Sequence, residues 1–234
     1  NSYGEKNQRA HVSALNRILE VFAPTDVLER VGWLLSSPWP RLPQGESKNH
    51  DARDIVVKKA QKEAAREVLD KTSLERILEF ASTIPYQCVL GRSIAMAVHD
   101  EGEGNTILDA MLARVTNMPV LVIGYALARV EVAGPNWIDQ QISRMKSQGN
   151  YTDEACASLY SALPEGSVTW SAVCAHGKDV ETAYWKRASG HSQADKNEDA
   201  PIAVEKLLDA GRPGAALQVA GNQKLSLPSF LLQR

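Results

Sequence analysis

The sequence predicts an all-α protein, an α-solenoid of antiparallel helical hairpins, and three observations lead to this expectation. Apolar residues recur at helical spacing along nearly the whole chain, as at Val12, Leu15 and Leu19. Prolines and glycines stand where helices are expected to begin and end. The predicted links are short, which makes consecutive helices antiparallel neighbours, and a chain of such pairs is typical of a solenoid. The alternative is a compact orthogonal helix bundle.

Each helix is expected where helical spacing continues between two breaks. Ile55, Ala60 and Ala64 belong to one apolar stripe that predicts a long helix. The tetrad 120–123 is strand-like, but Pro119 before it favours a buried helix. The expected helices cover 5–22, 25–36, 50–71, 73–83, 86–99, 105–116, 119–132, 136–148, 152–162, 167–175, 179–188, 198–210, 213–221 and 227–233.

Local signals mark several of the helix ends. Thr72-x-x-Glu75 predicts a capping box, in which the hydroxyl and the carboxylate each bind a free backbone amide. Pro213 is expected to start a helix, because its missing amide is harmless there. Further N-caps are expected at Asn136, Thr152 and Asp195, and helix stops at Gly134, Gly149 and Gly211.

The chain is expected to form one all-helical, repeat-like domain over residues 1–234. The proline-rich loop 36–49 and the polar loop 189–197 break the helical rhythm. Neither separates segments of independent composition, so both are interpreted as internal. The chain does not begin with Met, and its last residues resemble the first helix of a further pair, so we expect a piece cut from a longer protein.

Composition excludes several functional classes. The 26 Lys and Arg residues nearly balance the 28 Asp and Glu residues, and the net charge is −2. Binding to nucleic acid or to an anionic membrane depends on clustered basic residues, so neither is expected. No apolar run reaches the length of a membrane span, and no signal peptide is visible.

The three cysteines predict reduced thiols. Cys88, Cys156 and Cys174 are an odd number, are widely spaced and form no metal-binding motif with histidine. They are interpreted as small, buried apolar side chains, and their reduced thiols fit a cytoplasmic protein. No cofactor or metal is expected.

The segment from Val180 to Arg234 contains Lys206-Leu-Leu-Asp-Ala-Gly-Arg-Pro-Gly-Ala-Ala-Leu, an apolar helix end, a turn and a second helix start. This quarter of the chain resembles tetratricopeptide- or HEAT-like helical repeats of large bacterial multidomain proteins. Some of these are similar to the sensor arms of STAND-type NTPases. The resemblance implies a repeat arm that carries no catalytic residues, and the phosphate-binding motif G-x-x-x-x-G-K-[ST] is absent.

Two polar clusters invite a catalytic interpretation. His99-Asp-Glu-Gly-Glu103 could bind a cation or transfer protons, but its glycines favour a solvated link between helices. Cys174, His176 and Asp179 could pair a nucleophile with a base. Catalytic Cys and His usually come from separate segments, so a core cysteine beside a surface histidine is preferred.

The tryptophans suggest a binding surface. Trp33 and Trp137 lie on apolar faces and are expected in the core. Trp39 stands between two prolines and either packs back on the body or is exposed. The core interpretation is favoured for Trp170 and Tyr184. The candidate partner-binding residues are Trp39, Trp170, Tyr184, Trp185 and Arg187, because Trp, Tyr and Arg dominate interface energies.

We therefore expect a non-catalytic module, a scaffold or sensor, that binds a protein or peptide. One alternative is an enzyme with a site between helices near His99–Glu103. A second alternative is an oligomerisation segment.

Overall fold

The computed structural model describes residues 24–42, 50–190 and 199–222. Within these ranges the chain is 75% helical and contains no strand, which confirms the predicted all-α class. The helices expected at 5–22 and 227–233, and the N-cap expected at Asp195, lie outside the described residues.

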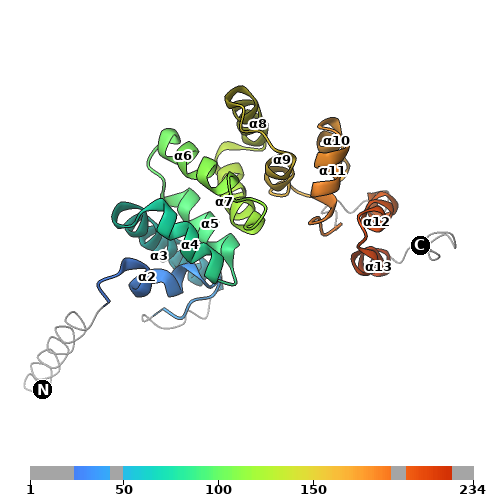
Figure 1. Ribbon diagram of the computed structural model, residues 1–234. Helices are drawn as coiled ribbons and strands as arrows, with labels where there is room; N and C mark the ends of the chain where they lie inside the picture. The colour runs from blue at the N-terminus through green and yellow to red at the C-terminus, as the bar shows by residue number, and fades with distance from the viewer. Residues whose placement is uncertain (1–23, 43–49, 191–198, 223–234) are drawn as a thin grey trace, which may run out of the picture.

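The described helices follow one another along an arc from α2 at one end to α13 at the other (Figure 1). Their bounds are α2 Val27–Leu35, α3 His50–Lys71, α4 Leu74–Thr83, α5 Gln87–Ala97, α6 Glu101–Leu112, α7 Pro119–Ala133, α8 Asn136–Gln148, α9 Asp153–Tyr160, α10 Ser167–Ala175, α11 Lys178–Trp185, α12 Asp199–Asp209 and α13 Pro213–Asn222.

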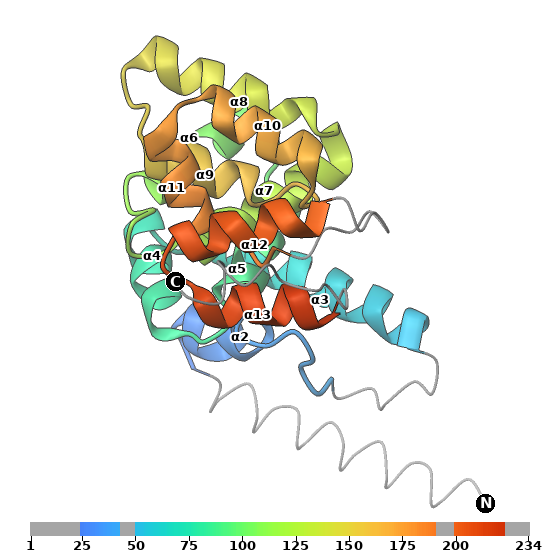
Figure 2. The same ribbon diagram turned by 90° about the vertical axis from the view of Figure 1, so that its right-hand side faces the viewer.

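Alternate helices stack on one another. α3 packs on α5, α5 on α7, α7 on α9, and α9 on α11. Each of α4, α6, α8 and α10 packs against a helix of that series that is its neighbour in sequence. Helices α12 and α13 form a closely packed pair at the end of the arc, and Figure 2 shows them side by side.

One continuous apolar core runs from α2 to α13. Trp137 is buried within it, as expected. The expectation for Trp33 is wrong, because 44% of this residue is exposed. The buried face of α2 contains Val27, Leu28 and Leu35. Trp33 lies on another face, where its indole N–H donates to the carbonyl of Arg30 in the same helix.

The closest helix crossing joins α5 and α7 at two glycines. A Cβ atom added to Gly91 would lie 2.2 Å from the carbonyl oxygen of Leu121. One added to Gly124 would lie 2.2 Å from the carbonyl oxygen of Cys88. Real Cβ atoms do not approach backbone this closely, so the two helices can meet in this way only where both residues are glycine.

Several helix ends occur where they were predicted. Gly134, Gly149 and Gly211 follow helix ends with positive φ, a conformation that glycine adopts without steric cost. Thr152 caps α9 by accepting from the amide of Ala155 at 3.1 Å. Pro213 is the first residue of α13.

Other predicted ends are wrong. The N-cap of α4 is Ser73, whose hydroxyl accepts from the amide of Arg76, and not Thr72. Asn136 is the first residue of α8, and Pro135 occupies the N-cap.

The helix expected at 105–116 is shifted, because α6 begins at Glu101 and ends at Leu112. Its first turn includes Gly104, which allows the hydroxyl of Tyr125 on α7 to donate to the Gly104 carbonyl at 2.9 Å.

Replacing Gly91 or Gly124 by Ala should destabilise the protein strongly. The added methyl group meets backbone that cannot rotate away, so we expect a loss of about 3 kcal/mol or more, at the upper end of overpacking costs. Urea unfolding followed by circular dichroism measures this loss. Gly214→Ala is the matched control, because Gly214 lies in α13 with open space around it and should change stability by less than about 1 kcal/mol. Equal effects at all three positions would contradict the close crossing.

Candidate functional site

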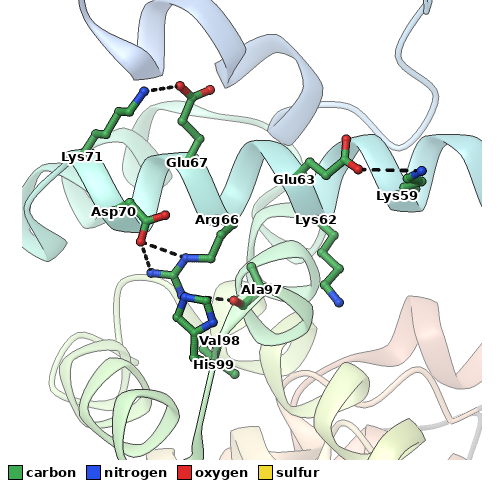
Figure 3. A pocket seen from close by; sticks show the side chains of 10 residues that line it. All are labelled: Lys59, Lys62, Glu63, Arg66, Glu67, Asp70, Lys71, Ala97, Val98 and His99. Atoms are coloured by element: carbon green, nitrogen blue, oxygen red, sulfur yellow. Dashed lines mark hydrogen bonds and ion pairs between the residues drawn. The ribbon is translucent and has the colours of Figure 1, made fainter.

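A cavity of about 730 Å³ lies between α3 and the segment that follows α5 (Figure 3). Its wall is rich in charged groups, but Ala97, Val98 and the aliphatic stems of the long side chains also contribute apolar surface. We call it the α3 groove. It is lined by Lys59, Lys62, Glu63, Arg66, Glu67, Asp70, Lys71, Ala97, Val98 and His99.

Helical periodicity places one stripe of α3 along this groove. Lys59, Lys62 and Arg66 recur at spacings of three and four residues, so they share a face. Ile55 lies one turn earlier on the same face, and 68% of it is exposed. The stripe therefore passes from an apolar residue near the start of α3 to a row of cations.

Arg66 joins three helices at the groove. Its guanidinium donates to Asp70 on α3, at 2.6 Å, and to the carbonyl of Ala97 at the end of α5, at 3.2 Å. It also binds the carboxylate of Glu103 on α6 at 2.9 Å. The hydrogen bonds that Arg66 donates to Glu103 and then to Asp70 raise the pKa of Arg66 above its ordinary value, so this side chain remains charged.

Three carboxylates at the groove, those of Glu67, Asp70 and Glu103, are held ionised by neighbouring cations. Hydrogen bonding from Arg66 lowers the pKa of Asp70 and of Glu103. The pKa of Glu67 is lowered chiefly by the hydrogen bond from Lys71, and also by Arg30 on α2. These acids serve as fixed anions that position the cations, and none has the raised pKa expected of a general acid.

The solvated link expected at His99–Glu103 is shorter than predicted, because exposed His99 and Asp100 lie between α5 and α6, whereas Glu101–Glu103 form the first turn of α6. Asp100 accepts from the amide of Glu103 at 2.8 Å, and Glu103 accepts from the amide of His99 at 2.7 Å. These reciprocal bonds satisfy free amides at the start of α6. The cluster therefore fixes the end of the groove, and Glu103 is already occupied by Arg66.

Three of the five candidate partner-binding residues do not form a surface. Trp170, Tyr184 and Trp185 are buried, and their rings pack on one another with Trp170 and Trp185 centroids 5.1 Å apart. Apolar faces of α10 and α11 meet at these rings, which explains their burial and confirms the core interpretation of Trp170 and Tyr184. Arg187 is half-buried and pairs with Glu154. Trp39 is 74% exposed.

The suggested nucleophile and base face different partners. The pKa of the Cys174 thiol is raised, first by burial and then by a hydrogen bond to Glu181. His176 instead lies 3.0 Å from the hydroxyl of Tyr160, which donates to Asp139. Burial lowers the pKa of His176. Cys174 and His176 therefore do not act on one another. The interpretation of Cys174 as a core cysteine is wrong, because this residue lies on an exposed face of α10.

No protein-family model matches the chain, and no match was found among curated proteins or solved structures. Within the described ranges, no helix is both long and apolar enough to cross a membrane. The same residues include no group of three or more His, Cys, Asp or Glu side chains arranged to hold a metal ion.

The α3 groove was missed because its signal resembles that of an ordinary solvated helix face. The sequence places Lys59, Lys62 and Arg66 among the polar positions of a long helix, a pattern common to many helices. This face becomes one wall of a cavity only because Ala97, the last residue of α5, and His99 just after it lie opposite α3. That position depends on tertiary packing.

Glu103→Gln should reduce stability in a pH-dependent way. Removing this carboxylate from Arg66 should lower the free energy of unfolding at pH 7 by about 1–3 kcal/mol, as for hydrogen bonds to charged groups. Because folding lowers the pKa of Glu103, its contribution is full above the ordinary value near 4.5 and is lost as the pH falls through the lowered pKa. Urea unfolding at several pH values between 7 and 3 should show the two proteins converging at the acid end.

The control for this prediction is Glu101→Gln in the same turn of α6. Glu101 is exposed and makes no ion pair among the described residues. Its replacement should have little effect at any pH, so a loss equal to that of Glu103→Gln would contradict a specific role for the Arg66 pair.

Proposed function

We propose that this chain is a non-catalytic module that binds a protein or peptide, and that its helical hairpins form an α-solenoid. The binding surface is the end of the molecule built by α2 and α3, with the α3 groove as its polar part. The observation that carries this proposal is the exposure of large apolar side chains on α2, on α3 and on the segment after α2, together with the cavity of about 730 Å³ that α3 also lines.

The stacking of alternate helices supports the solenoid arrangement. In a solenoid each hairpin contacts mainly its neighbours, which is how α3, α5, α7, α9 and α11 are arranged. Helices α5, α7, α9, α11 and α13 begin at residues 87, 119, 153, 178 and 213. Tetratricopeptide repeats recur every ~34 residues, and most of these spacings are similar.

Exposed apolar residues support binding at the α2–α3 end. Trp33, Trp39, Ile55 and Val56 all belong to these two helices and the segment after α2. The hydrogen bonds from Gln61 to the carbonyls at Leu34 and Ser37 hold that segment against α3. In the rest of the described chain, exposed large apolar residues are scattered along the elements. Trp33 and Trp39 are both exposed, and tryptophan is enriched among the residues that dominate interface energies.

The chemistry of the groove favours binding over catalysis. The carboxylates of Asp70 and Glu103 are both bound to Arg66, which leaves neither free to move a proton. In the His99–Glu103 cluster of the enzyme alternative, Asp100 is also occupied, because it caps α6 by accepting from the amide of Glu103. A wall of mutually paired charges with apolar floor residues instead suits an extended or helical segment of a partner protein.

Selection of peptides from a random library on the immobilised chain tests the proposed surface. We expect enriched peptides whose affinity falls about tenfold on Ile55→Asp or Trp39→Ala, because each change removes an exposed anchor of the proposed contact. Val168→Asp is the control, since Val168 is at least as exposed but lies on α10.

Two results would contradict this proposal. One is the absence of any enriched peptide, and the other is an equal loss of binding on Val168→Asp. Sedimentation velocity of the same proteins separates the oligomerisation alternative. In that case the wild-type chain would associate with itself, and Ile55→Asp would be monomeric.

Hydrogen exchange on Gly211→Val tests the solenoid arrangement. Gly211 has φ +71°, so a β-branched residue there should cost about 1–3 kcal/mol of strain. In a solenoid, stability is a sum of neighbour terms, and protection should fall in α12 and α13 while α5 and α7 keep theirs. Equal loss of protection in both regions would instead identify one cooperative bundle.

A further inference from the structure

We propose that the α3 groove binds an acidic segment of a partner protein, and that the ammonium of Lys62 receives its carboxylate. This inference rests on the proposed function and names the chemistry of the partner. It depends on how the charges of α3 are paired.

Lys62 is the unpaired cation in a row of paired ones. Lys58 binds Asp54 at 2.7 Å, and Lys59 lies 3.9 Å from Glu63. Arg66 binds both Asp70 and Glu103. The side chain of Lys62 makes no ion pair or hydrogen bond among the described residues, and it is exposed.

The helix itself offers Lys62 no carboxylate. Residues three or four positions away on a helix are neighbours, and for Lys62 these include Lys58, Lys59 and Arg66. Like charges at these spacings repel one another. An incoming carboxylate would relieve this repulsion, whereas an incoming cation would increase it.

The geometry of the groove leaves Lys62 available. Figure 3 shows its side chain extending from α3 on the same side as Arg66 and His99, beside Ala97. Arg66 is held by its three partners and cannot turn to a ligand without losing them. Lys62 can therefore bind a ligand without breaking an existing contact.

The exposed Ile55 adds a second element to the recognition. Ile55 and Lys62 are two helical turns apart on one face, which corresponds to roughly 10 Å along the axis. An extended peptide covers about this distance in three residues. A segment with an apolar residue followed three positions later by Glu or Asp, or the reverse order, would contact both.

A single carboxylate fits this groove better than a phosphate backbone. Glu63, Glu67 and Asp70 also line the groove and would repel a polyanion whose charges are closely spaced. A peptide that carries one carboxylate at Lys62 and apolar residues elsewhere avoids this repulsion.

Fluorescence anisotropy with labelled 12-residue peptides tests the inference on the full chain. The probes share a Leu-x-x-X core in which X is Glu, Gln or Lys, and a 12-nucleotide single-stranded DNA serves as the polyanion. We expect the Glu peptide to bind about fivefold more tightly than the Gln peptide, and the Lys peptide more weakly than both. Lys62→Glu should remove the preference for Glu, and Lys62→Arg should retain it.

Lys186→Glu is the matched control, because Lys186 is also exposed and follows α11, far along the arc from α3. It should leave all affinities within about twofold. Peptides that bind equally whatever X is, and that lose affinity on Ile55→Asp, would overturn the role of Lys62 but retain the proposed function. No binding by any peptide would overturn both, and tighter binding of the DNA than of the Glu peptide would replace the acidic peptide by a nucleic acid.

Discussion

The backbones of α5 and α7 meet at Gly91 and Gly124, and this crossing lies at the centre of the helix stack. On one side of the crossing, α5 packs against α3, which lines the groove. On the other side, α7 packs against α8 and α9. A methyl group on either glycine would collide with backbone of the facing helix. Since backbone cannot adopt another rotamer, any larger residue would separate the helices and shift both halves of the stack relative to one another.

Arg66 connects this crossing to the surface. Ala97 is the last residue of α5, and its carbonyl accepts a hydrogen bond from Arg66. The Arg66 guanidinium also donates to the carboxylate of Glu103 in the first turn of α6. The same guanidinium therefore holds the junction between α5 and α6 against α3. Partly buried, charge-assisted bonds of this kind are stronger than ion pairs in open solvent, so the groove wall is held in place before a ligand arrives. A preformed wall reduces the entropy lost on binding.

Local rules predicted much of the fold, and tertiary contacts determined the rest. The helix ends at Gly134 and Gly149 depend only on a local positive φ. Glycine adopts this conformation readily, so the residue type alone predicts them. The start of α6 was misplaced because Gly104 disfavours a helix by propensity, whereas the hydroxyl of Tyr125, from another helix, requires close approach there. The candidate site was likewise predictable only where local sequence signals define it, and not where it depends on tertiary contacts. The two prolines around Trp39 allow for its exposure, but the groove depends on where α5 places Ala97 beside α3, which no pattern along the chain encodes.

The charges of the groove also indicate what kind of recognition it can support. An exposed ion pair between a lysine and a carboxylate contributes at most about 1 kcal/mol to the binding free energy, because water screens the charges and the lysine side chain loses conformational freedom. Lys62 alone cannot then supply tight binding, and an apolar contact such as that offered by Ile55 must add to it. Each of these two contacts is weak by itself. Discrimination between partner segments would therefore depend on a carboxylate and an apolar side chain that are spaced to reach Lys62 and Ile55 at the same time. The rigid α3, with both residues on one face, fixes that spacing, and a partner that matches it can bind specifically while still dissociating rapidly.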